Sequence, residues 1–301
     1  MDSRREPHRP LLAPAAWSVL IVFSDLPDIL WSHAAGVVPP WLPWAKAAAL
    51  AAGLIACLGW RALRPLLPFA LVMLAFELAL RASAALQATP SWRATFAGDA
   101  ASFTRGYFGL FLPDLGVAAA VLAVLWWIKR RRSDFFLVRG DLGAPIEPVR
   151  WLGIRSGESW RRFAWIFAAV AGLGVAIPTF LSLRVAPGAL LRAAPLLPAA
   201  VAFAAVNAFT EEVYFRASLL ATLPEVVGRR QAQLMNVALF GLAHWLYGSP
   251  PGLIGAAMTG FLAFLLGKAM LETRGLVWPW FIHFVPDVVI FASYAIVWAG
   301  R

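Results

Sequence analysis

The chain has 301 residues, of which 61% are hydrophobic and 14% are charged. Soluble domains have roughly 45 to 50% apolar and about 25% charged residues, so this composition excludes an ordinary soluble enzyme. The 26 Lys and Arg residues outnumber the 16 Asp and Glu residues and give a net charge of +10; because basic residues of a membrane protein mainly set its orientation, we expect no nucleic-acid partner.

The chain has one cysteine, Cys57, which lies in an apolar run. One thiol can form neither an internal disulfide nor a cysteine-based zinc site. Any chemistry must therefore come from other polar side chains.

Successive apolar runs are each long enough for a helix that crosses the roughly 30 Å hydrocarbon core of a membrane. They lie near 12–33, 42–60, 66–86, 106–128, 163–183, 195–220, 232–248, 251–271 and 276–298. Asp25, Pro27 and Asp28 interrupt the first run, so it is either a span or a re-entrant helix. The sequence predicts an all-α, polytopic transmembrane helix bundle of about eight to nine spans, embedded in the lipid bilayer.

Most basic residues fall on one side of the membrane if the spans alternate from a cytoplasmic N-terminus. Arg4, Arg5 and Arg9 precede the first run, and the densest basic group lies in the polar segment 129–162. Basic segments favour the cytoplasmic side, so we expect both to be cytoplasmic. The high alanine and arginine content favours a bacterial cytoplasmic (inner) membrane.

The same polar segment divides the chain into parts. We expect an N-terminal membrane region of four spans at 1–128, a basic cytoplasmic loop at 129–162 and a membrane core at 163–301. In the first part, Glu77 and Arg81 share a helix face and are explained as a self-neutralising pair. Asp25 and Asp28 fit a cavity lining or a broken helix equally well.

The C-terminal part carries ionisable residues in an ordered pattern within its apolar runs, where each is costly and usually faces a bundle interior. The stretch NAFTEEVYFRASLL places Glu211 beside Glu212, with Arg216 four residues after Glu212. On an α-helix, Glu212 and Arg216 share a face while Glu211 points about 100° away. One carboxylate can thus pair with the arginine and leave the other available.

Two later runs each place a histidine one helical turn from a second distinctive residue. Phe240 precedes His244, and His283 precedes Asp287 in a run that Pro286 should kink. At 1.5 Å per residue, Glu211, His244 and His283 lie roughly 10 to 18 Å from the expected cytoplasmic ends of their helices. One shallow layer can therefore hold all three.

These groups suit hydrolysis, but the spacing alone leaves other functions open. A carboxylate can take a proton from water, a histidine can position that water, and a second histidine can stabilise an oxyanion. Glu211, His244 and His283 could instead bind zinc, which we rank second because the chain has no HExxH motif. A buried packing network and a proton or ion pathway explain the pattern comparably well.

Together these motifs resemble the CPBP family, the CAAX-protease and bacteriocin-processing group of intramembrane glutamic endopeptidases. Its pattern of EExxxR, FxxxH and HxxxN or a related residue is matched in order by the residues named above, and the resemblance covers about 160–298. It implies an intramembrane protease whose Glu211 and His244 activate water and whose His283 and residue 287 stabilise the oxyanion. Glu212, Arg216 and Phe240 would support the site, and no cofactor is implied.

One residue departs from the family pattern. Asp287 stands where the Ras-converting CAAX endopeptidases have asparagine, and a carboxylate donates a hydrogen bond only when it is protonated. Asp287 could instead orient His283. The resemblance implies a membrane-anchored or membrane-inserted protein or peptide substrate, while a non-catalytic scaffold, a bacteriocin-immunity protein and a proton-coupled transporter remain alternatives.

Overall fold

The computed structural model describes residues 9–98, 101–183, 188–248 and 250–300. Of the residues in these ranges, 82% are helical, and two isolated bridges are their only β-type pairing. The expected all-α class is confirmed. Arg4 and Arg5 of the basic N-terminus lie outside the described residues.

Seven helical segments in the described ranges are long and apolar enough to cross a membrane, or eight if the pair α1 (Arg9–Phe23) and α2 (Leu26–Ala35) forms one span. This pair bends by 54° where the sequence predicted an interruption. The seven are α3 (Leu42–Gly59), η1 with α4 (Arg61–Ala88), α6 (Phe103–Lys129), α7 (Trp160–Ser182), the segment Ala189–Val227, α13 (Leu253–Thr273) and α14 (Val277–Ala299). The polytopic membrane class is therefore confirmed.

One of the expected spans is missing from this set. The run near 232–248 forms α12 (Arg229–Tyr247), but it is not among the helices apolar enough to cross a membrane. Arg229, Arg230 and Gln231 occupy its first turn, and Asn236 and His244 lie further along it. The observed seven or eight spans therefore overlap only the lower end of the expected range.

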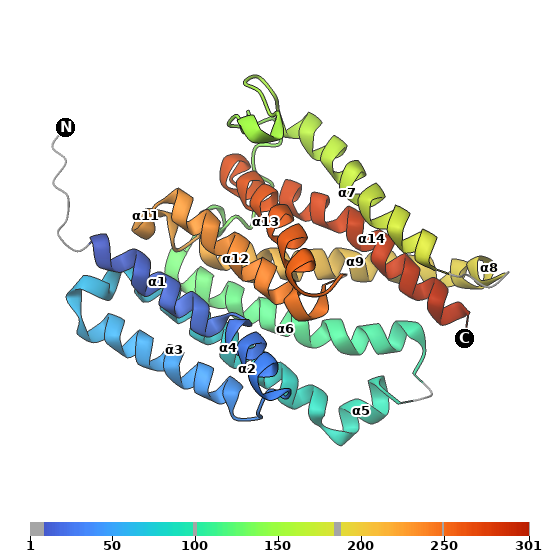
Figure 1. Ribbon diagram of the computed structural model, residues 1–301, viewed down its shortest axis with the longest axis horizontal. Helices are drawn as coiled ribbons and strands as arrows, with labels where there is room; N and C mark the ends of the chain where they lie inside the picture. Colours follow the sequence, from blue (N-terminus) through green and yellow to red (C-terminus); the bar gives the residue numbers. More distant parts are fainter. Residues whose placement is uncertain (1–8, 99–100, 184–187, 249, 301) are drawn as a thin grey trace. The chain divides into compact units, whose positions relative to one another are not determined.

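The helices group into two compact units. The first unit consists of residues 1–81, 120–137 and 213–268, and the second consists of residues 82–119, 138–212 and 269–301. In Figure 1, α1, α3 and α12 belong to the first unit, and α7, α9 (Leu197–Glu211) and α14 belong to the second.

Polar contacts join the helices of the first unit. Trp17 of α1 donates its Nε1 hydrogen to Gln231 of α12 at 3.1 Å, and Lys46 of α3 pairs with Asp28 of α2 at 2.8 Å. The expected pair of Glu77 and Arg81 is confirmed at 3.1 Å. An ion pair to Asp28 also explains one acidic residue of the broken first run, since pairing offsets the cost of burying its charge.

Helices α12 and α13 of the first unit approach closely. Asn236 donates to the carbonyl of Ala263 at 2.8 Å and Gln233 to that of Phe264 at 2.6 Å. A Cβ atom on Gly241 would lie 2.8 Å from the carbonyl oxygen of Ala256. Small residues and side-chain hydrogen bonds are the usual means of joining helices in membranes.

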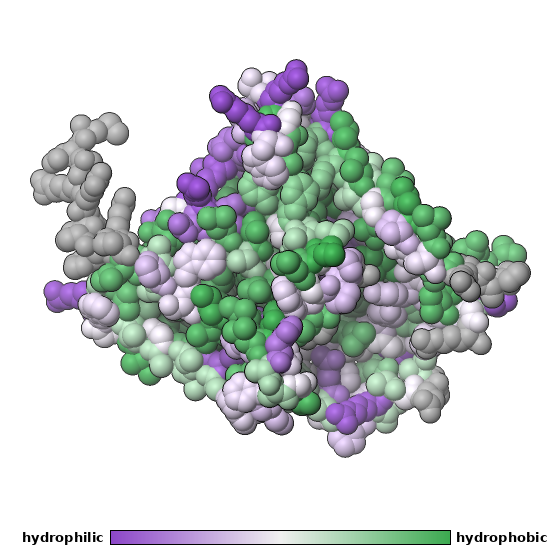
Figure 2. All heavy atoms as spheres, viewed as in Figure 1, coloured by the Kyte–Doolittle hydropathy of each residue, from purple (hydrophilic) through white to green (hydrophobic). Residues whose placement is uncertain are grey.

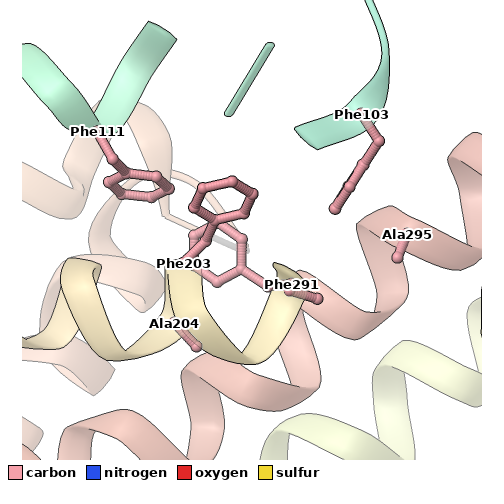
Figure 3. Packing of buried hydrophobic residues seen from close by; sticks show 7 residues of the cluster. Phe103, Phe111, Phe203, Ala204, Phe291 and Ala295 are labelled. Carbon is pink, nitrogen blue, oxygen red and sulfur yellow. The ribbon is translucent and has the colours of Figure 1, made fainter. Parts of the chain in front are cut away.

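In the second unit, α14 packs against α7, α8 (Ala189–Ala193) and α9. Aromatic rings fill the space between α6, α9 and α14, where Phe111, Phe203 and Phe291 gather (Figure 3). The centroid of the Phe111 ring lies 5.6 Å from that of Phe203 and 5.4 Å from that of Phe291. This cluster fixes the register of α14 against α9.

The polar segment before α7 is attached to the start of α14. The amide of Leu276 donates to the carbonyl of Val138 at 2.9 Å, and Trp278 Nε1 donates to the carbonyl of Leu142 at 3.0 Å. Figure 2 shows hydrophilic residues over this segment and hydrophobic residues along α7. The exposed apolar side chains of α7 suit contact with lipid.

Candidate active site

The two adjacent glutamates lie where an α-helix changes to a π-helix. Helix α9 ends at Glu211, and the π-helical turn η5 (Glu212–Ala217) precedes the short α10 (Ser218–Leu220). The expected span near 195–220 is present, but this turn departs from α-helical geometry because a π-helix bonds residues five apart rather than four. Single π-helical turns recur at functional sites.

Carboxylates flank both ring nitrogens of His283 on α14. Nδ1 lies 2.9 Å from Glu212 Oε1, while Nε2 lies 3.5 Å from Glu211 Oε2 and 3.8 Å from Asp287 Oδ2. A carboxylate accepts hydrogen bonds, so Nδ1 donates to Glu212. The imidazolium form can donate on both sides of the ring.

Asn207, which the sequence analysis did not single out, completes this group. Its Nδ2 donates to Asp287 Oδ2 at 3.0 Å and lies 3.3 Å from Glu211 Oε1. With the contacts of His283, these distances describe a closed ring of four side chains, which we call the polar ring: Asn207, Glu211, His283 and Asp287. In the sequence, Asn207 could have been found as an amide residue four positions before Glu211, on the same helical face.

Exposure distinguishes the three carboxylates that surround His283. Glu212 is 0% and Asp287 is 5% exposed, whereas the side chain of Glu211 is 20% exposed. His283, at 4%, is also buried. Glu211 is therefore the more exposed of the two carboxylates in the polar ring.

The remaining predicted site residues form a stack in the first unit. Arg216 Cζ lies 4.1 Å from the ring centroid of Phe240, and that centroid lies 4.3 Å from the centroid of the His244 ring. A guanidinium over an aromatic face is a favourable cation–π arrangement. Phe240 thus separates the arginine from the histidine, which gives the phenylalanine of the FxxxH motif a physical role.

The orientation of His244 fixes its tautomer. Its Nδ1 lies 2.9 Å from the carbonyl oxygen of Phe240. A carbonyl only accepts, so Nδ1 carries a hydrogen and Nε2 of the neutral ring keeps its lone pair. A half-buried imidazole with this tautomer can accept a proton at Nε2.

The predicted residues thus fall into two sets. The structure brings Glu211, Glu212, His283 and Asp287 together within the second unit, and it brings Arg216, Phe240 and His244 together within the first. In the described ranges, no group of three or more His, Cys, Asp or Glu side chains is arranged to hold a metal ion.

Comparison with known proteins identifies the segment that holds these residues. Residues 193–289 match the family model described as type II CAAX prenyl endopeptidase Rce1-like. No curated protein matches the chain. No solved structure matches it either. The matched segment includes Asn207 and every predicted site residue, from Glu211 to Asp287. Residues 193–289 are thus similar to the type II CAAX prenyl endopeptidases, which supports membership of the CPBP/CAAX protease family.

Proposed function

We propose that the protein is an intramembrane endopeptidase that hydrolyses a peptide bond of a membrane-anchored or membrane-inserted protein, with water activated by Glu211 and His244. The main support is the position of Glu211. It is the most exposed carboxylate in a group of buried acids around one imidazole, within a segment that matches a CAAX endopeptidase family.

In this proposal Glu211 removes a proton from water, and the oxygen of that water attacks the scissile carbonyl carbon. The carbonyl oxygen becomes an oxyanion, the C–N bond then breaks, and the proton passes to the leaving nitrogen. A positioned general base contributes about 10²- to 10⁴-fold to such a rate. His244 assists through its Nε2 lone pair, the atom that its backbone hydrogen bond leaves available.

His283 supplies the positive charge and the N–H group that stabilise the oxyanion. Glu212 orients it through the 2.9 Å contact with Nδ1. Asp287 serves the same imidazole from the Nε2 side, at 3.8 Å, rather than donating to the oxyanion itself. Arg216 and Phe240 support His244 through the cation–π stack.

The proposal uses no metal or other cofactor. We place the protein in a bacterial cytoplasmic membrane with its N-terminus in the cytoplasm, and its substrate near the cytoplasmic leaflet. Positive residues concentrated in segment 129–162 support this orientation.

Peptide termini in the membrane proteome test the function before any substrate has been identified. Cells would carry the wild-type protein, Glu211→Gln or the control Glu225→Gln at equal abundance. Glu225 suits the control because its side chain is 88% exposed and pairs with Lys129 only at 3.8 Å, and exposed pairs contribute little to stability. We expect new termini with the wild type and the control that disappear with Glu211→Gln.

Two outcomes would point elsewhere. Identical termini in all three strains, with a normal phenotype for Glu211→Gln, would favour a scaffold or immunity protein. Identical termini together with solute uptake that depends on membrane potential and on Glu211 would favour a transporter.

A further inference from the structure

We propose that Asn207 is a positioning residue of this site. Its side-chain amide on α9 joins Glu211 to Asp287, whereas the family pattern has an amide at position 287, on α14. This inference rests on the proposed function of the same site and adds a residue that the family motifs do not contain.

The geometry suits one amide shared by two carboxylates. Nδ2 of Asn207 lies 3.0 Å from Asp287 Oδ2 and 3.3 Å from Glu211 Oε1. An amide nitrogen carries two hydrogens, so it can donate to both oxygens at once. Because Asn207 precedes Glu211 by one turn of α9, the donor stays on the helix of the proposed base.

The charges around the site explain why a donor is needed there. Glu211 and Asp287 each approach the same nitrogen of His283, Nε2, at 3.5 and 3.8 Å. Two carboxylates at one nitrogen repel each other, and a donor between them offsets that repulsion. Asn207 does not ionise and cannot take the proton from water, so its role is to hold the acceptors in place.

The amide of this group stands on a different helix from the amide of the family pattern. The pattern has the amide at position 287, whereas here position 287 is an acid and position 207 is an amide. Moving the amide back to α14 should therefore preserve the function of the group. This expectation is testable with isosteric substitutions.

The experiment compares Asn207→Asp, Asp287→Asn and the double variant Asn207→Asp/Asp287→Asn. The readout is the initial rate at which wild-type-dependent peptide termini accumulate after induction, divided by the amount of folded protein. Thermal unfolding of each purified variant in detergent is measured in parallel. The control is Thr210→Val, because Thr210 is buried on the same helix and its hydroxyl donates to the backbone carbonyl of Asn207 at 3.0 Å.

We expect Asn207→Asp to lower the rate by about ten- to a hundredfold, the range for a lost hydrogen bond to a charged group. The double variant should recover at least about tenfold over Asn207→Asp, and Thr210→Val should match the wild type. A double variant no faster than Asn207→Asp would overturn the inference.

A second pair of variants adds no charge and covers the case in which Asn207→Asp does not fold. Asn207→Ala should lose about tenfold, and Asn207→Ala/Asp287→Asn should regain most of that loss because the donor returns on α14. If Asn207→Ala cleaves at the wild-type rate, this inference is overturned while the proposed function stands. A wild-type protein that produces no new termini would instead overturn the proposed function, and this inference with it.

Discussion

His283 has an acidic partner at each ring nitrogen, and the two sides differ in kind. On the Nδ1 side Glu212 is fully buried and makes a 2.9 Å contact. On the Nε2 side Glu211 and Asp287 lie at 3.5 and 3.8 Å. In the proposed mechanism the short contact orients the ring, and the Nε2 side faces the oxyanion.

Replacement of Glu212 tests its orienting role. Glu212→Gln keeps an acceptor oxygen but removes the charge, and a hydrogen bond to a charged group is worth about 1.5 to 3 kcal/mol. We expect cleavage to fall about ten- to a hundredfold, with a lower melting temperature. Terminus accumulation and thermal unfolding, measured beside Glu225→Gln, check this; unchanged cleavage would remove Glu212 from the site.

The phenylalanine of the first unit can be tested in the same way. Phe240→Leu removes the ring between Arg216 and His244, and a desolvated cation–π contact is worth about 2 kcal/mol. We expect a lower melting temperature and slower cleavage. Phe180→Leu is the matched control, because Phe180 is 43% exposed on α7. Equal effects of the two substitutions would contradict a specific role for Phe240.

At this scale the sequence predicted which candidate residues lie together around His283 but not all their partners. The spacing of His283 and Asp287 predicted a shared helix face, and the structure places them 3.8 Å apart. Asn207 could not be found this way, since an asparagine on an apolar helix has many uses until the register of α14 against α9 is known. That register depends on packing between residues more than 70 positions apart, such as Asn207 and Asp287.

At the scale of the elements, the π-helical turn η5 is the main departure from the predicted pattern. Apolar periodicity places a helix at 195–220. It does not show where a π-helical turn, with about one more residue than an α-helical turn, interrupts that helix. The turn begins at Glu212, directly after the proposed base, and ends at Ala217. The directions of the side chains within this turn therefore had to come from the structure.

Close approach of α7 to α14 provides an element-scale test. A Cβ atom on Gly172 would lie 2.9 Å from Val285 Cγ1, two residues after His283, whereas a Cβ atom on Gly174 would meet nothing within 4 Å. We expect Gly172→Ala to destabilise the protein by about 1 to 3 kcal/mol through overpacking and to slow cleavage. Gly174→Ala should be neutral or stabilising by up to about 1 kcal/mol.

Thermal unfolding and terminus accumulation measure both glycine variants. The two positions lie on the same helix, so helix propensity affects them alike and only the contact with Val285 differs. A Gly172→Ala protein as stable and active as Gly174→Ala would show that the α7–α14 approach does not position His283.

At the scale of the whole molecule, the polytopic helical class could be predicted from composition and run length alone. The number of spans could not, because α12 has the length of a span but carries polar residues throughout. The first run is likewise a bent pair of helices, with a 54° angle between them. The length of a helix decides whether it can reach across the membrane, and its apolar composition decides whether it is a candidate span.

Orientation is testable because Cys57 is buried, at 3% exposed. We expect a cysteine introduced at the exposed position Ser133 or Ser156 to react with a membrane-impermeant maleimide only from the cytoplasmic side, since segment 129–162 is basic. A cysteine introduced at Thr95 should react only from outside. The reverse pattern in intact cells and inverted vesicles would contradict a cytoplasmic location for segment 129–162.

The most direct test of the central claim is single-turnover cleavage by purified protein in proteoliposomes. The substrate would be a synthetic peptide that spans a cut site found by the terminus comparison, with protein in excess over peptide. We predict that Glu211→Gln lowers the rate by about 10²- to 10⁴-fold at an unchanged melting temperature. A folded Glu211→Gln protein that cleaves the peptide at the wild-type rate would contradict the glutamate mechanism.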